Sequence, residues 1–246
     1  MSLVLSLFPG IGLLDMAFEE EGFCVVRGPD LLWGGDIRRF HPPAGRFDGV
    51  IGGPPCQRWS RLANIVRAVH GEASVAPDLI PDFRRIVLEA APDWFVMENV
   101  PTAPLPETCY AEQSFVANNR WTGAEQNRER RFTFGSRLGL RIRPRWEALL
   151  SSNWEPAVCS TAGGRRASVA IGGSGKPKGN QGLRPEARLR NRTLARECEL
   201  QGLPTGFLSD APFTLEGKRR AIGNGVPLPM GRAIARAVKA ALESQP

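Results

Sequence analysis

The chain has 246 residues, of which 42% are hydrophobic and 23% are charged, and its formal net charge is +7. Apolar residues at this frequency exclude disorder as the main state, and no run of about 18 apolar residues is present to span a membrane. The pI near 9.7 favours a polyanionic partner. The length fits one globular domain, with room for a small second lobe.

The five cysteines and two histidines limit the kinds of site. No two cysteines form a C-x-x-C pair, which disfavours a disulfide scaffold and a zinc knuckle and favours a reducing, cytoplasmic compartment. The N-terminus has no basic stretch followed by a long apolar one, so we expect no secretory signal. His41 and His70 lie in no local signature of a hydrolase. We therefore expect no metal site and no Ser-His or Cys-His hydrolase.

Apolar strands alternate with helices along the chain. Strands are predicted, in order, at Leu3–Phe8, Phe23–Arg27, Phe47–Ile51, Trp94–Met97 and Arg131–Phe134. Helices are predicted between Gly12 and Gly22, over Asp82–Ala90 and over about Pro229–Leu242. This alternation predicts an α/β fold, in which helices cover the faces of a mostly parallel sheet.

A glycine turn, Phe8-Pro9-Gly10-Ile11-Gly12, joins the first strand to the first helix. Glycine permits a tight turn and a close ligand, and the helix N-terminus offers free N–H groups. Asp30 follows at the end of the second strand, where an acid can bind ribose hydroxyls. Asp36 and Ile37 could present a carboxylate and an apolar face to an adenine ring. Alone, the turn lacks the third glycine of the dinucleotide fingerprint, so a structural turn and, for Asp36, a loop cap explain these residues equally well.

A thiol and a carboxylate follow two neighbouring strands. The prolines of Pro54-Pro55-Cys56-Gln57 end the third strand, which puts Cys56 at the carboxyl edge of the sheet, where open α/β folds bind ligands. Glu98-Asn99-Val100 ends the next strand, so Glu98 is expected to face the same site. In isolation Cys56 would be a small buried apolar residue and Glu98 a solvated strand end.

Two basic features lie further along the chain. Residues 126–132 open another strand, in which alternation sends Arg128 and Arg130 to one side; a charged surface edge is the alternative. Between Arg137 and Arg192 there are 12 basic and 3 acidic residues, and residues 163–182 are rich in Gly, Ser and Lys. This stretch is typical of a flexible solvated loop and equally of a loop that closes on phosphates.

Together these segments resemble the DNA (cytosine-5)-methyltransferase family of bacterial and phage type. Each triplet is common by chance, but six motifs in the family's order are highly specific. They run from residue 3 to about 236 as Phe8-x-Gly10-x-Gly12, Pro54-Pro55-Cys56-Gln57-x-Trp59-Ser60, Glu98-Asn99-Val100, Gln126-x-Arg128-x-Arg130, Arg192-x-Leu194-x-Arg196-Glu197 with Gln201-Gly202-Leu203-Pro204, and Gly223-Asn224-x-Val226-Pro227.

The resemblance implies a Rossmann-like, class I S-adenosylmethionine-dependent methyltransferase fold with helices on both faces of the sheet. Residues 1–140 and 192–246 would form the catalytic domain, and residues 141–191 a small target-recognition region. The implied reaction transfers a methyl group from S-adenosylmethionine to C5 of a flipped-out cytosine in double-stranded DNA through a covalent adduct of Cys56 with C6, and releases S-adenosylhomocysteine. A cytoplasmic monomer without a metal, of bacterial or phage origin, acting in restriction–modification or DNA marking, is expected.

The family's roles can be carried over by matching position. Cys56 is then the nucleophile, Glu98 contacts N3 and N4 of the cytosine with a raised pKa, Arg130 contacts its O2, and Arg128 supports the site. The residues expected to line the cofactor pocket are Phe8, Gly10, Gly12, Asp30, Asp36, Ile37, Pro55, Asn224 and Val226. The nucleic-acid contacts expected from a mobile loop over Gln57–Ala76 and from the recognition region are Arg58, Ser60, Arg61, Arg165, Arg166, Lys176 and Lys178. A solvated charge is the alternative for each basic residue.

The sequence departs from the family pattern in three places. Ser6 stands where the family often has an acid, and Leu13 replaces a usual glycine. Leu31–Gly35 is too short for the family's helix between the second and third strands, which leaves the role of Asp30 open. Competing functions are cytosine-5 methylation of RNA, a catalytically silent DNA-binding relative, and a nicotinamide-dependent oxidoreductase, which Leu13 disfavours.

Overall fold

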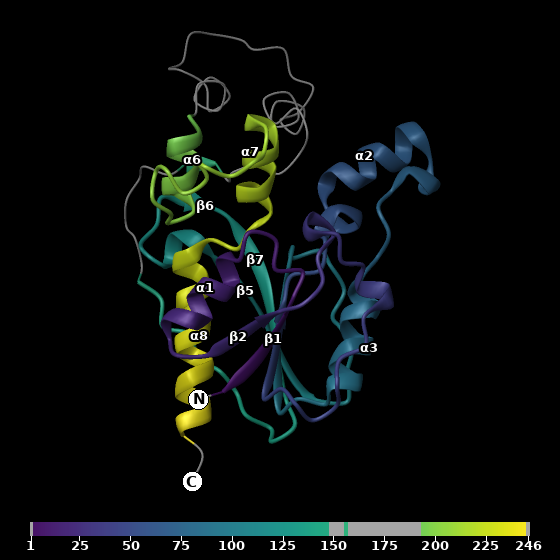
Figure 1. Ribbon diagram of the computed structural model, residues 1–246, viewed down its shortest axis with the longest axis vertical. Helices are drawn as coiled ribbons and strands as arrows, with labels where there is room; N and C mark the ends of the chain where they lie inside the picture. The colour runs from purple at the N-terminus through teal and green to yellow at the C-terminus, as the bar shows by residue number, and fades with distance from the viewer. Residues whose placement is uncertain (1, 148–154, 157–192, 245–246) are drawn as a thin grey trace.

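The computed structural model describes residues 2–147, 155–156 and 193–244, and six strands within them form one sheet (Figure 1). The strand order is β2-β1-β3-β4-β7-β5. β1 to β4 pair in parallel, whereas β7 runs antiparallel to both β4 and β5. The strand bounds are β1 Leu3–Leu7, β2 Cys24–Arg27, β3 Gly49–Gly52, β4 Trp94–Asn99, β5 Ala111–Asn118 and β7 Glu129–Ser136, with a separate two-stranded pair of β6 Gln126–Asn127 and β8 Glu155–Pro156.

Helices lie on both sides of this sheet. The α-helices are α1 Leu13–Glu20, α2 Arg61–His70, α3 Ile80–Ala90, α6 Leu194–Leu200, α7 Leu215–Asn224 and α8 Leu228–Glu243. Short 3-10 turns span Leu31–Trp33, Ile37–Arg39, Cys56–Trp59, Glu72–Ser74 and Asn119–Trp121. Figure 1 shows α1 and α8 on one side of the sheet and α3 on the other, with α2, α6 and α7 around its upper end. No helix within the described residues is both long and apolar enough to cross a membrane.

The core has one layer on each face of the sheet. Phe18 of α1 and Ile234 of α8 pack with Trp94 on one face, and Phe83 of α3 packs with Phe95 on the other. The central strands are buried on both faces and therefore consist of nearly continuous apolar runs. The helices bury only one stripe, so their apolar residues recur at helical spacing.

The predicted α/β class, with a mostly parallel sheet and helices on both faces, is confirmed. The five predicted strands and three predicted helices are present, with ends that differ by at most two residues. No α-helix lies between β2 and β3, as the short connection led us to expect. The Gln57–Ala76 segment, for which the resemblance implied a mobile loop, consists mostly of α2 and two 3-10 turns, and its mobility stays a prediction.

The topology also determines where a ligand would bind. The chain leaves β1 for β2 at one edge of the sheet and then returns to the other side of β1 to form β3. Strand order therefore reverses between β1 and β3, and open α/β sheets bind ligands at the carboxyl ends of strands at such a point. The glycine turn follows β1 at this place, and Cys56 follows β3.

Candidate active site

The glycine turn leads from β1 into α1 through left-handed backbone. Phe8 and Gly10 both have φ of 56°, and Gly12 has φ of 80°. A Cβ on Gly12 would lie 2.9 Å from Arg27 Nη2, whereas a Cβ on Gly10 would meet nothing within 4 Å. Left-handed backbone favours glycine, and the strained Phe8 is a feature that clusters at functional sites. The turn therefore borders an open space at Gly10.

Asp30 lies against this turn. Its Oδ2 accepts a hydrogen bond of 2.9 Å from the Gly10 N–H, and its Oδ1 accepts one of 2.7 Å from the Leu32 N–H. Sequence reasoning missed Trp33, whose Nε1 donates to Gly10 O at 2.8 Å while the residue stays 62% exposed. A tryptophan in a short, glycine-flanked connection was the available signal. Asp30 and Trp33 thus hold both backbone polar groups of Gly10.

Asp36 and Ile37 lie in the next 3-10 turn. Asp36 accepts hydrogen bonds from the Arg38 N–H and guanidinium, which lower the pKa of its carboxyl to about 2. Asp36 is therefore a loop cap, as the simpler interpretation proposed, and stays ionised. Ile37 packs into the core layer that α3 covers and is only 4% exposed.

The ends of β3 and β4 are joined by a side chain. Asn99 Nδ2 donates to Pro54 O at 3.0 Å, which fixes the Pro54-Pro55 segment ahead of the 3-10 turn that begins at Cys56. Pro55 and Cys56 are half-buried. Burial raises the pKa of the Cys56 thiol, and the positive charges of Arg130 and Arg128 oppose this rise. The negative charge of Glu98 raises the same pKa further.

Glu98 at the end of β4 is buried, and its Oε1 lies 2.9 Å from Arg130 Nε. Burial raises the pKa of Glu98, against the lowering effect of the Arg130 and Arg128 charges. A Cβ on Gly53 would come 2.9 Å from Glu98 Oε2, so glycine there leaves room for the carboxyl group. The structure therefore brings Cys56, Glu98, Arg128 and Arg130 within electrostatic reach of one another.

Arg128 connects these residues to the α7–α8 connection. Its Nη2 donates to Gly223 O at 2.8 Å and to Gly225 O at 3.1 Å, and the residue is 3% exposed. Asn224, which lies between these two glycines in the sequence, is exposed, and Val226, which follows Gly225, is buried. The Gly223 motif thus spans the end of α7 and the connection to α8, and it is held by a residue that immediately precedes β7.

The expected nucleic-acid contacts are described only in part. Arg58 pairs with Glu72, with 2.7 Å between Nη2 and Oε1, and its guanidinium lies 5.9 Å from the centre of the Trp59 ring. Ser60 caps α2 by accepting from the Ala63 N–H. Arg61 opens α2, but its side chain is not described, and Arg165, Arg166, Lys176 and Lys178 lie outside the described residues.

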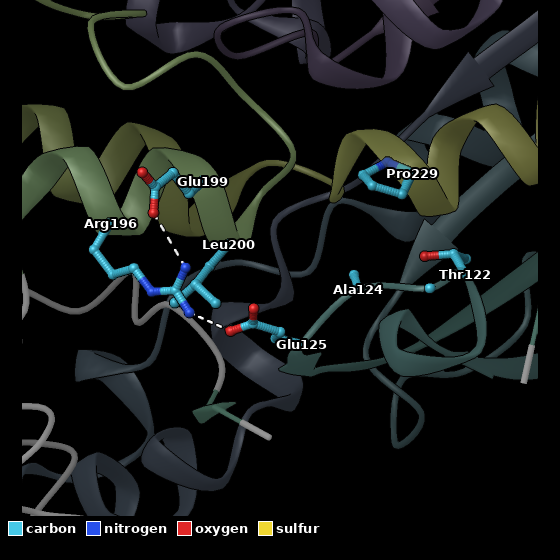
Figure 2. A pocket seen from close by; sticks show the side chains of 8 residues that line it. Thr122, Ala124, Glu125, Arg196, Glu199, Leu200 and Pro229 are labelled. Carbon is cyan, nitrogen blue, oxygen red and sulfur yellow. Dashed lines mark hydrogen bonds and ion pairs between the residues drawn. The ribbon is translucent and has the colours of Figure 1, made fainter. Parts of the chain in front are cut away.

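A separate hollow of about 270 Å³ lies between α6, the segment Thr122–Glu125 and Pro229 at the start of α8 (Figure 2). Arg196 crosses it and pairs with both Glu125 and Glu199. None of the expected catalytic or cofactor residues lines it. Within the described part of the chain, no cluster of three His, Cys, Asp or Glu side chains could hold a metal ion.

Known proteins resemble this chain in sequence and in fold. The model of the family described as C-5 cytosine-specific DNA methylase matches residues 34–158. The Type II methyltransferase M.NgoPII of Neisseria gonorrhoeae is 30% identical over 172 residues, which cover 57% of this chain and 49% of that protein. The chain thus spans about half the length of this curated relative.

Two solved structures resemble the whole chain. The methyltransferase EhMeth of Entamoeba histolytica superposes with a TM-score of 0.67 at 12% identity, over 98% of this chain and 99% of that one. A putative DNA modification methyltransferase encoded within an E. coli prophage superposes with a TM-score of 0.65 at 17% identity, over 99% of this chain and 100% of that one. At these identities the likeness shows the fold alone.

Proposed function

Since this chain belongs to the C-5 cytosine-specific DNA methylase family, we propose that it transfers a methyl group from S-adenosylmethionine to C5 of cytosine in double-stranded DNA. One observation carries the proposal: the buried Glu98 carboxyl pairs with Arg130 at 2.9 Å, and the charges of both act on the Cys56 thiol. A nucleophile, a buried carboxyl and a cation at one sheet edge match what addition to a pyrimidine ring requires.

Cys56 begins the reaction. C5 of cytosine is a poor nucleophile, so the Cys56 thiolate first forms a bond to C6, and the electrons of the C5–C6 double bond make C5 nucleophilic. C5 would then take the methyl group, whose bond to the sulfonium sulfur breaks and leaves its electron pair on that sulfur as a neutral thioether. Loss of the C5 proton restores the double bond, and the same electron pair expels Cys56 from C6. Only the thiolate attacks, and Arg130 and Arg128 provide the positive charge that favours it.

Glu98 and Arg130 stabilise the charge that this addition creates. Because burial raises the pKa of Glu98, the carboxyl group takes up a proton more readily than an ordinary one and can share it with N3 as negative charge builds on the ring. Arg130 then faces O2 of the same ring. The cytosine must leave the helix stack to reach these groups, at a cost of a few kcal/mol.

The cofactor site is proposed at the glycine turn. The open space at Gly10 lets a ligand approach the backbone, and the Asp30 carboxylate has acceptor capacity left beyond its two backbone bonds for ribose hydroxyls. Asn224 and Val226 would complete the pocket, because Gly225 between them packs on Leu13 just after the turn, and bound S-adenosylmethionine would supply an electrophilic methyl group. Residues 1–140 and 192–246 would form the catalytic domain, with target recognition in residues 141–191.

The test is transfer of labelled methyl from S-adenosylmethionine to unmethylated duplex DNA and, in parallel, to RNA, followed by nucleoside analysis. We expect 5-methylcytosine in DNA and none after Cys56→Ser. Cys109→Ser is the control, because that thiol precedes β5 at the opposite edge of the sheet. Label only in RNA would reassign the substrate, and label in DNA with Cys56→Ser would contradict the assigned nucleophile.

A further inference from the structure

Gln201 is a fully buried residue at the C-terminal end of α6. Its side-chain Nε2 donates to Ile222 O at 2.6 Å and reaches Gly225 O at 3.3 Å. Its own carbonyl accepts a bond of 2.9 Å from the Leu228 N–H. One residue therefore binds the last turn of α7, the α7–α8 connection and the first residue of α8.

This connection contacts Arg128 and the start of α1. Gly225 O, which Gln201 reaches, also accepts from Arg128 Nη2 at 3.1 Å. A Cβ on Gly225 would come 2.5 Å from Leu13 Cδ1, so the connection packs tightly on the first residue of α1, just after the glycine turn. Asn224 and Val226 flank the same glycine. A shift of Gly225 would therefore move Arg128 together with the two residues that are proposed to line the cofactor pocket.

We propose that Gln201 is a positioning residue for cofactor binding, which acts by holding Gly225 and, through it, Arg128 and the Asn224–Val226 segment. The inference rests on the function proposed above. Gln201 touches neither the glycine turn nor Cys56 in any described contact, so its effect is indirect.

The chemistry of the contacts explains why an amide is needed. The Gln201 side chain donates to two backbone carbonyl oxygens, so only a side chain that carries a hydrogen-bond donor at a suitable length can replace it. Gln201 Oε1 is buried and has no hydrogen-bond partner in the described part of the chain, so the amide acts here as a donor alone. Methionine has a similar length and volume but cannot donate, and glutamate would place a carboxylate against two carbonyl oxygens.

The matched control is Gln113, another glutamine whose amide bonds to backbone. It donates to Ile142 O and accepts from the Ile142 N–H, both at 3.0 Å, from the outer strand β5. Gln113→Met therefore removes comparable bonds far from the α7–α8 connection. Calorimetric binding of S-adenosylmethionine, thermal unfolding without ligand, and kcat and KM for the cofactor would be measured for the wild type, Gln113→Met, Gln201→Met and Gln201→Glu.

We expect Gln201→Met to weaken S-adenosylmethionine binding by about three- to tenfold, the worth of one or two hydrogen bonds, and to raise KM for the cofactor more than it lowers kcat. Gln113→Met should bind as the wild type does. Gln201→Glu should bind worse than Gln201→Met at pH 8 and recover towards pH 6, because protonation turns the carboxyl group into a donor.

The outcomes separate the inference from the proposed function. A wild-type chain that binds no S-adenosylmethionine would remove the proposed function, and the inference with it. Normal wild-type binding with equal affinity in Gln201→Met would overturn the inference alone. An equal loss of affinity in Gln113→Met and Gln201→Met would also overturn it, because the effect would then be general loosening of the fold.

Discussion

Arg130 and Glu98 pair across two antiparallel strands, with 2.9 Å between Nε and Oε1. The register of β4 and β7 places Glu98 opposite Phe132, so Arg130 is its diagonal neighbour on the same face of the sheet. The positive charge of Arg130 lowers the pKa of Glu98 and that of Cys56, against burial, which raises both. One guanidinium thus acts on both groups that the proposed chemistry titrates.

Arg130→Gln should make Cys56 less reactive. Removing the guanidinium leaves burial unopposed by the largest lowering charge, so the pKa of the Cys56 thiol rises further. The thiolate fraction at pH 8 then falls, about tenfold if the pKa rises by one pH unit. Iodoacetamide labelling followed by peptide mapping would measure it, with the exposed Cys109 as internal reference. Equal or faster labelling of Cys56 in the variant would refute this electrostatic account.

Gly10→Ala should cost cofactor affinity without unfolding the protein. A Cβ there enters open space, so the penalty to stability is the left-handed backbone of φ 56°, about 1 kcal/mol. Gly45→Ala is the control, because Gly45 has φ of 67° and an equally open Cβ position, in the turn that precedes β3. Both variants should lose similar stability in urea, but only Gly10→Ala should bind S-adenosylmethionine more weakly. If Gly10→Ala and Gly45→Ala bound S-adenosylmethionine with the same affinity, the cofactor would have to bind elsewhere.

Asp15 should make stability depend on pH. It is fully buried beneath the glycine turn, accepts from Ser6 Oγ at 2.5 Å and from Arg27 Nε at 3.1 Å, and has a raised pKa because burial outweighs these contacts. The folded state then binds the Asp15 proton more tightly than the unfolded state. Stability from this group is therefore present at low pH. It is lost as pH rises from about 4 through the folded pKa, by about 1.4 kcal/mol for every pH unit that separates the folded and unfolded pKa values.

Asp15→Asn removes this titration. Urea unfolding between pH 4 and pH 7 should show the wild type gaining stability relative to Asp15→Asn as the pH falls. Glu243→Gln, on an exposed residue at the end of α8, serves as a charge-matched control and should follow the wild type. If the wild type instead became more stable relative to Asp15→Asn as the pH rose, the effect of the Arg27 ion pair on the Asp15 pKa would outweigh that of burial.

Glu72→Gln should strengthen DNA binding. Glu72 pairs with both Arg58 and Arg67. Its carboxylate therefore competes with DNA phosphates for these two guanidinium groups. Removing it should raise affinity and steepen the plot of log affinity against log salt by about one. Fluorescence anisotropy with a labelled duplex measures both quantities. Glu107→Gln, at an exposed residue in the connection ahead of β5, changes the net charge equally. A matching gain in affinity in that variant would show that overall charge causes the effect.

The strands that are buried on both faces were predictable from sequence, whereas the half-exposed β5 and α2 were not. β1, β3 and β4 are buried on both faces, so their apolar runs stand out. β5 is a half-exposed outer strand that contains Glu112 and Gln113 among its apolar residues, and its pattern predicts no strand. α2 was also missed, although Leu62, Ile65, Val66 and Val69 recur at helical spacing, because the loop expected by resemblance took precedence.

The sequence predicts those site residues that directly follow a recognisable strand. Cys56 and Glu98 each follow a recognisable parallel strand, so their placement at one edge follows from fold class. The pairing of Arg130 with Glu98 does not, because nothing in the pattern of residues 129–136 says that β7 runs antiparallel. Nor does the sequence reveal that the Arg128 guanidinium holds the carbonyls of Gly223 and Gly225, which lie more than ninety residues away.

The antiparallel pairing of β7 with β4 makes the site sensitive to the length of the chain as well as to its composition. Side chains alternate between faces, so slipping β7 by one residue would send Arg130 to the α3 side of the sheet. Deleting one residue between Arg130 and Ser136 would thus put Glu129 in the place of Arg130 and strip Glu98 of its counter-charge, while every motif letter remained. Insertions in the Pro-rich connection ahead of β5, which sets no such alignment, would leave that pairing untouched.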